Sequence, residues 1–155
     1  MADMLVRLYS LPSLDISNLE KEGITIQRTF PADKKAVLEW VEKNFSSYGA
    51  AECERTFFNN PVSTFLAVKD KKIVGFASYN GTARDFFGPT AVSDEYRGKG
   101  IGKALLLSCL YALKEEGYYY AIIGGVGPAA FYQECCGAIM IPSSTPGPYK
   151  DFLQL

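Results

Sequence analysis

Histidine is absent from this sequence of 155 residues. Its absence excludes the Ser-His-Asp and Cys-His catalytic arrangements and removes the most common metal ligand in proteins. The four cysteines form no Cys-x-x-Cys pair, so no zinc site is expected, and we predict that the protein binds no metal. Any acid–base chemistry must therefore use carboxylates, tyrosine, cysteine, backbone amides or water.

An excess of charge and long apolar runs are missing as well. The net charge is −1, so no overall positive field favours binding to nucleic acid or to an anionic membrane. No segment approaches the roughly 18 consecutive apolar residues that predict a transmembrane helix. The first residues include an acidic side chain and show no signal-peptide pattern. We predict a cytoplasmic protein of one domain, with neither nucleic acid nor membrane among its partners.

The hydrophobic pattern predicts strands and helices in alternation. Strands are expected at residues 24–30, 64–68, 73–79, 85–92, 118–126, 138–141 and 149–155. Helices are expected at residues 33–45, 51–58, 101–117 and 129–136. This order indicates an α/β fold in which a mixed sheet of six to seven strands is flanked by about four helices. Residues 1–22 are interpreted as an N-terminal extension packed on the domain, whose apolar patch could cover the sheet or contact a second subunit in a homodimer.

The strongest functional signal lies between the strand predicted at residues 85–92 and the helix predicted at residues 101–117. Three glycines and three cations coincide there: Gly98, Gly100 and Gly102 with Arg97, Lys99 and Lys103. The start of a helix offers unpaired backbone N–H groups and a partial positive charge, which suit a phosphate group. Glycines let that phosphate approach the backbone. The segment therefore predicts a local anion site in a nearly neutral protein.

Three phosphate-binding motifs can be compared with this segment. The P-loop does not fit, because Arg97 stands at its first glycine and Ala104 follows Lys103. The dinucleotide motif Gly-x-Gly-x-x-Gly does not fit either, because Lys103 stands at its third glycine. The spacing Arg-x-x-Gly-x-Gly matches fully at Arg97, Gly100 and Gly102. A tight turn without a ligand would explain the glycines but not the cations and the helix start beside them.

This segment resembles the acetyl-coenzyme A motif of the GCN5-related N-acetyltransferase (GNAT) family. A second segment, Gly127–Ala138, resembles the family's helix after the fifth strand, with its Phe-Tyr pair and closing glycine. The resemblance extends over residues 24–155 and implies a V-splayed central sheet, with residues 23–155 as the GNAT domain and acetyl-CoA as co-substrate. The cofactor-binding residues that it implies are Ala91, Val92, Arg97, Gly98, Lys99, Gly100, Ile101, Gly102 and Lys103.

The resemblance also assigns catalytic groups. It implies that Tyr132 protonates the departing thiolate, although an aromatic pair on a helix also serves core packing. Many relatives carry a glutamate on the fourth strand, whereas the only carboxylate of this predicted strand is Asp85. Glu52 and Glu54 on the helix predicted at residues 51–58 are the remaining candidates for the base. Side chains two positions apart on a helix point about 200° apart, so at most one of these two glutamates faces the site. We favour Glu54.

The function that the resemblance implies is acetyl transfer from acetyl-CoA to a primary amine of a small molecule or a protein. Direct attack in a ternary complex is expected, because no histidine-activated cysteine could hold an acyl intermediate. Two alternatives stay open. One is a catalytically weak acyl-CoA-binding sensor or regulatory module, which the missing strand glutamate favours. The other is a protein that binds ATP or GTP through the same glycine loop.

Overall fold

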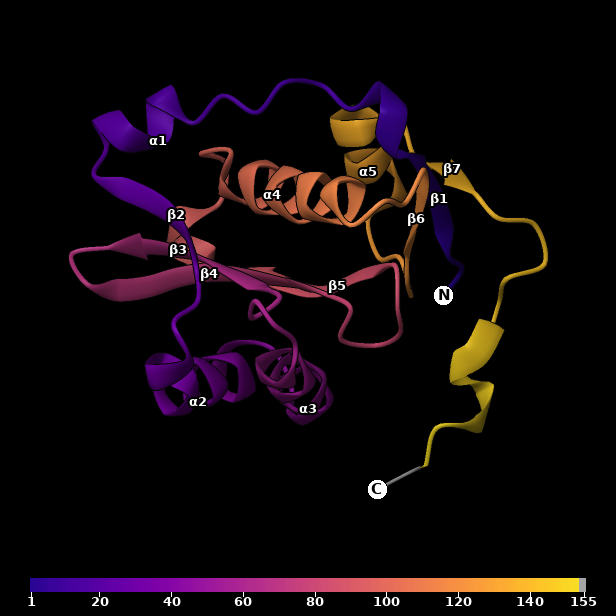
Figure 1. Ribbon diagram of the computed structural model, residues 1–155, viewed down its shortest axis with the longest axis horizontal. Coiled ribbons are helices and arrows are strands. Elements are labelled where there is room, and N and C mark those ends of the chain that lie inside the picture. The colour runs from indigo at the N-terminus through magenta and orange to yellow at the C-terminus, as the bar shows by residue number, and fades with distance from the viewer. Residues whose placement is uncertain (154–155) are drawn as a thin grey trace.

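The computed structural model describes residues 1–153 and contains a mixed sheet with the strand order β2-β3-β4-β5-β6-β1-β7 (Figure 1). The strands are β1 (Met4–Arg7), β2 (Ile24–Arg28), β3 (Thr64–Lys69), β4 (Lys72–Tyr79), β5 (Phe86–Val92), β6 (Tyr120–Ile123) and β7 (Ile139–Met140). The helices are α1 (Ser17–Lys21), α2 (Lys34–Asn44), α3 (Ser47–Arg55), α4 (Ile101–Glu115) and α5 (Ala129–Cys136). The predicted α/β fold with a mixed sheet is confirmed.

Helices cover both faces of the sheet. Helices α2 and α3 lie on one side of it, and α4 lies on the other with α1 and α5 beside it (Figure 1). A smaller core of five buried residues joins α2 and α3 to the sheet: Val37, Val41, Cys53, Leu66 and Phe76. The larger core surrounds α4, from which ten side chains are buried. Because strand β4 lies between the two cores, six of its eight residues are buried.

The core around α4 gives a test of stability. Leu110 is fully buried, and its replacement by alanine is expected to lower the free energy of unfolding by about 2–5 kcal/mol, because burial is lost and a cavity is left. Chemical denaturation monitored by circular dichroism measures the change. Glu115→Ala on the exposed side of the same helix is the control and should stay within about 0.5 kcal/mol of the native value. Equal losses in both variants would contradict the assignment of this core.

Strands β5 and β6 diverge after a short contact. They are parallel and pair only at Phe86 with Ile122 and at Phe87 with Ile123. Beyond that point β5 continues to Val92 along β4, while β6 ends. The divergence begins at Gly88, whose φ of 120° requires glycine, and at Pro89, which has no N–H to donate to a neighbouring strand. The sheet is therefore V-shaped, as predicted.

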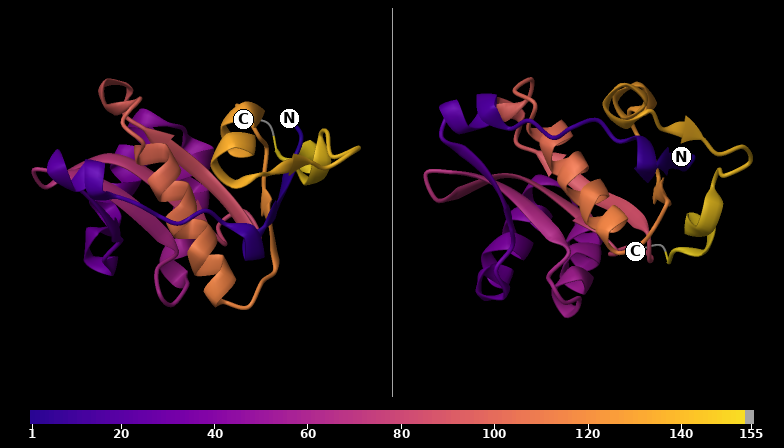
Figure 2. Two further views of the ribbon diagram at one scale, coloured as in Figure 1. Left: turned by 90° about the horizontal axis from the view of Figure 1, so that it is seen from above. Right: turned by 45° about the horizontal axis from the view of Figure 1, so that its top comes forward.

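Residues near the N-terminus form part of the sheet. Strand β1 lies antiparallel between β6 and β7, and the segment after it runs beside α4, where Tyr111 donates a hydrogen bond to the Pro12 carbonyl at 2.7 Å (Figure 2). No strand was predicted in residues 1–22. The alternation of buried Met4 and Val6 with exposed Arg7 is the signal of a strand, although a short one. The predicted apolar patch thus supplies an inner strand of the sheet.

Two predicted elements differ from the structure. The helix predicted at residues 51–58 begins earlier, because the Ser46 hydroxyl caps α3 by accepting a hydrogen bond from the Gly49 N–H at 2.9 Å. The prediction of a strand at residues 149–155 is wrong for residues 149–153, which the structure describes, since Gly147–Asp151 form a 3-10 helix. Pro146 and Pro148 restrict the backbone there and cannot donate to a ladder. Residues 154 and 155 lie outside the described residues.

Candidate functional site

The glycine loop leads directly into α4. Gly98 and Gly100 have φ values of 81° and 90°, a left-handed conformation that strongly favours glycine. A Cβ atom on either residue would meet no other atom within 4 Å. The backbone of the loop is therefore open to the surroundings, and the left-handed conformation rather than crowding explains these two glycines.

The first turn of α4 has free donors. No side chain caps the helix, and its first helical hydrogen bond runs from the Ala104 N–H to the Gly100 carbonyl at 3.1 Å. The N–H groups of Ile101, Gly102 and Lys103 precede that bond and have no helical acceptor. They add to the positive end of a helix of 15 residues. An anionic group at this position would satisfy all three donors.

The three cations of the loop differ in their surroundings. Arg97 lies 3.2 Å from the Asp94 carboxylate, and the Lys99 ammonium lies 3.0 Å from that of Glu22. Lys103 is exposed and forms no ion pair within residues 1–153. Lys103 is thus the cation most available to a bound phosphate, whereas Lys99 is directed towards the segment after α1.

One cavity joins the glycine loop to the divergence of the strands. Its volume is about 810 Å³. It contains eight of the nine predicted cofactor-binding residues, and Lys99 is the exception: Ala91, Val92, Arg97, Gly98, Gly100, Ile101, Gly102 and Lys103. Phe45, from the turn between α2 and α3, and Met1 also line it. The edge of β5 from Gly88 to Val92 faces this cavity and has no partner strand on that side within the described part of the chain.

Tyr132 on α5 lines the same cavity. Its ring packs edge-to-face against Phe87 and Phe131, with centroid distances of 6.2 and 5.1 Å. Its hydroxyl has no hydrogen-bond partner among the residues that the structure describes, and burial raises the pKa of this hydroxyl to about 12. Tyr132 is therefore protonated at neutral pH and has a free donor beside the cavity, in addition to its packing role.

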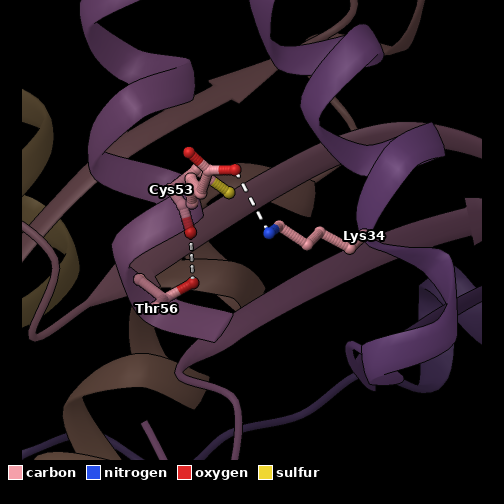
Figure 3. Close-up of polar contacts among 4 residues, drawn as sticks. Lys34, Cys53 and Thr56 are labelled. Atoms are coloured by element: carbon pink, nitrogen blue, oxygen red, sulfur yellow. Dashed lines mark hydrogen bonds and ion pairs between the residues drawn. The ribbon is translucent and has the colours of Figure 1, made fainter. Parts of the chain in front are cut away.

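Glu54, which we favoured as the base, lies elsewhere. Its carboxylate pairs with the Lys34 ammonium at 3.2 Å, with both side chains exposed between α2 and α3; Figure 3 shows this ion pair as a dashed line beside the hydrogen bond from Thr56 to the Cys53 carbonyl. Glu54 does not line the cavity. Glu54 is exposed, whereas Cys53, the residue before it on α3, is buried against the sheet.

Glu52, the other candidate, is directed inward. One of its carboxylate oxygens is buried and has no hydrogen-bond partner in residues 1–153, an unfavourable arrangement for a polar group. Burial raises the pKa of Tyr149 to about 12, and the negative charges of Asp3 and Glu52 contribute to this rise. The Tyr149 hydroxyl fills the space that a Cβ on Gly124 would occupy, and Gly124 lines the cavity.

Asp85, the strand carboxylate noted in the sequence, precedes β5. Burial, with a contribution from the Glu116 charge, raises its pKa to about 6, and one of its oxygens has no hydrogen-bond partner within the described residues. It does not line the cavity, and in fact no aspartate or glutamate of residues 1–153 does. Neither candidate on α3 lines the cavity. They differ in their surroundings: Glu52 has a buried carboxylate oxygen and its charge acts on Tyr149, whereas Glu54 is paired with Lys34 at the surface.

None of the helices in residues 1–153 combines the length and the hydropathy that a membrane crossing requires.

No curated protein sequence matches the chain significantly. The model of the acetyltransferase (GNAT) family matches residues 31–138, which include the glycine loop and α5.

Solved structures with the same fold share little sequence with this chain. The GCN5-related glucosamine N-acetyltransferase region of a fungal multi-domain β-N-acetylglucosaminidase has a TM-score of 0.72 at 15% identity, over 90% of this chain and 19% of the other. A GCN5-related N-acetyltransferase from Sphaerobacter thermophilus has a TM-score of 0.66 at 22% identity, over 90% and 48%. A GNAT-family acetyltransferase from Colwellia psychrerythraea has a TM-score of 0.63 at 14% identity, over 90% and 53%.

The chain thus covers between about a fifth and about half of the length of these proteins. At identities of 22% or less, the similarity shows a shared fold and no more. The match to the family model covers more than half of the sequence and contains both motifs that the resemblance rested on. Together with the uncapped start of α4 beside the V of the sheet, it establishes that this chain belongs to the GNAT acetyltransferase family.

Proposed function

We propose that the protein transfers an acetyl group from acetyl-CoA to a primary amine of a small molecule or a protein, in a ternary complex. GNAT proteins use acyl-CoA. The observation that carries the proposal is that one cavity contains the free donors of α4, the free edge of β5 and the Tyr132 side chain. The four buried cysteines, none of which is in a disulfide bond, fit a reducing compartment such as the cytoplasm.

The residues present fit a coenzyme A molecule. Its pyrophosphate would be held by the N–H groups of Ile101, Gly102 and Lys103, with the side chain of Lys103 as counter-ion. Its extended arm would lie along the edge of β5, where Ala91 and Val92 can pair with it as another strand would. A bound acetyl thioester supplies an activated carbonyl carbon, and backbone N–H groups on that edge would polarise the carbonyl.

The amine must lose a proton before it can attack. We assign this step to Glu52, whose carboxylate would accept one proton from the acceptor ammonium. The neutral nitrogen then forms a bond to the carbonyl carbon, and the bond from carbon to sulfur breaks. Tyr132 would donate its hydroxyl proton to the departing sulfur and recover a proton from the new amide nitrogen. The products are an amide and a thiol, with one proton released through Glu52.

An acyl-CoA-binding module without activity is the second candidate, and one observation favours it: the described lining of the cavity contains no carboxylate. Acetyl transfer measured over a panel of polyamines, amino acids, aminoglycosides and peptide N-termini separates the two functions. Turnover of any amine supports the enzyme. Tight binding of acetyl-CoA with no turnover over the whole panel supports the module.

A substitution at Gly102 tests the cofactor site directly. A Cβ there would lie 3.5 Å from the Phe131 ring, an ordinary contact, so Gly102→Ala should fold and gain up to about 1 kcal/mol of helix stability. The added methyl group would lie where the pyrophosphate must approach, and acetyl-CoA affinity is expected to fall at least about tenfold, which corresponds to about 1.4 kcal/mol. Calorimetry and thermal unfolding of the same samples measure both effects.

Gly117→Ala is the control for this test. Gly117 lies at the far end of α4, where its φ of 103° disfavours alanine, so this variant should lose stability and keep its acetyl-CoA affinity. The glycine loop would lose its assigned role if Gly102→Ala bound acetyl-CoA as tightly as the native protein does.

A further inference from the structure

A second cavity, of about 630 Å³, lies at the other end of α4. It is bounded by the connection between β4 and β5 (residues 80–84), the last turn of α4, the last residue of α3 and the segment of residues 58–63. It shares no lining residue with the cavity of the proposed active site. The reaction proposed above therefore leaves this cavity without a role.

Three of the five arginines in the sequence line this second cavity: Arg28, Arg55 and Arg84. Within residues 1–153 none of the three forms an ion pair. The other charged residues that line the cavity are Glu115 and Glu116. The carboxylate of Glu116 accepts hydrogen bonds from the Asn80 side chain at 3.2 Å. Neither glutamate thus forms an ion pair with any of the three guanidinium groups, although all five charged side chains line the same cavity.

Arg28 is held in a fixed position. Its Nη1 donates to the Val62 carbonyl at 2.8 Å and to the Tyr79 hydroxyl at 2.7 Å. Its guanidinium also stacks over the Phe65 ring, 4.6 Å from the centroid. These contacts occupy one nitrogen of a half-buried guanidinium, and the other two nitrogens have no hydrogen-bond partner among the described residues. A partly desolvated charge with spare donors in a planar fork suits a carboxylate or a phosphate.

The other two arginines lie at the rim. Arg55 donates to the Asn59 side chain at 2.7 Å, which orients it along the cavity wall. Arg84 is exposed and has no side-chain hydrogen bond in the part of the chain that the structure describes. Neutral polar groups complete the lining: Asn59, Asn60, Ser63 and Thr82. The cavity therefore offers one fixed cation on its wall and two adaptable cations at its entrance.

We propose that this cavity is a binding site for a small anion that carries a carboxylate or phosphate group, held by Arg28, Arg55 and Arg84. An occupant would join the end of α3, which supplies Arg55, to the connection between β4 and β5, which supplies Arg84. That connection already packs on α3, since Gly81 lies against the Glu52 carbonyl, and it leads into the first residue of β5. Binding should therefore raise thermal stability.

Inorganic phosphate and succinate serve as the two probes, compared at constant ionic strength by calorimetry and thermal unfolding. Arg55→Gln/Arg84→Gln removes two exposed charges from this cavity, and affinity for the bound probe should fall at least about tenfold. Arg97→Gln/Lys103→Gln removes two exposed charges from the glycine loop instead and should leave that affinity within about twofold. Arg28→Lys, which keeps the charge but loses the planar fork, should also weaken binding.

Binding of either probe that is lost in the first double variant and kept in the second supports the site, and the tighter probe identifies the anionic group. If the loss occurs in the glycine-loop variant instead, the anions bind at α4 and the proposal is overturned. Absence of binding by the folded native protein, for both probes at concentrations up to tens of millimolar, overturns it as well. Neither result bears on acetyl-CoA binding, which the same samples measure separately.

Discussion

Replacement of Tyr132 by phenylalanine is expected to lower kcat for amine acetylation by about 10²–10⁴-fold, the range for loss of a general acid. The ring would keep its contacts with Phe87 and Phe131, and the lost hydroxyl has no partner within the described residues, so thermal stability should not fall. Because the pKa of Tyr132 is raised to about 12, deprotonation of this group should not limit the native rate below about pH 10. Steady-state kinetics from pH 6 to 10 measure both effects.

A donor with a better leaving group separates protonation from packing. Acetate esters of nitrophenols release a weaker base than a thiolate, because the nitro group withdraws charge from the phenolate oxygen. Acetyl transfer from such a donor should therefore lose less activity in Tyr132→Phe than transfer from acetyl-CoA. An equal loss with both donors would indicate that the tyrosine positions the reactants. A kcat within about threefold of the native value would leave Tyr132 only its packing role.

Glu52→Gln is expected to reduce kcat/KM at pH 7 by about 10²-fold or more, since the carboxylate is assigned the proton of the acceptor. An alkylamine with a pKa of about 10.4 is neutral in only about one molecule in 10³ at pH 7. Without a base, the rate should depend on that fraction and rise about tenfold per pH unit. The difference between variant and native protein should therefore shrink as the pH approaches the pKa of the amine.

Glu54→Gln is the matched control, because it makes the same chemical change two residues away on the same helix. Its carboxylate pairs with Lys34 at the surface, and an exposed pair contributes at most about 1 kcal/mol to stability. Activity and its pH dependence should match those of the native protein. If Glu54→Gln loses activity and Glu52→Gln keeps it, the assignment of the base to Glu52 is wrong.

The cofactor side of the site could be predicted because its signals are local. Glycines of left-handed conformation, a helix start and the apolar stripe of α4 are adjacent in the sequence and depend little on distant residues. The same is true of α5, which begins after Pro128 and ends at Gly137, both as predicted from turn chemistry. The model of the family matches this same part of the chain.

The acceptor side could not be predicted in the same way, because it depends on contacts between distant segments. Glu52 and Glu54 look equivalent in the sequence, and the helix period says only that they differ in direction. Which of the two glutamates faces inward depends on where α3 begins and on what packs against it. Ser46 caps a helix that begins four residues earlier than expected, and residues 147–153 return to α3. There the charge of Glu52 contributes to the raised pKa of Tyr149, and the Tyr48 hydroxyl donates to the Leu153 carbonyl.

The position of β1 has a consequence for how the protein folds. Residues 4–7 leave the ribosome well before either of their partners, since Met4 pairs with Ile123 on one side and with Met140 on the other. Until those partners are synthesised, the apolar side chains of Met4, Val6 and Leu8 have no sheet to enter and can attract chaperones or other nascent chains. Contacts of such long sequence separation also form slowly. The α5 wall, which carries Tyr132, should therefore be assembled late, and a nascent chain should complete its sheet only after residues 139–140 have been synthesised.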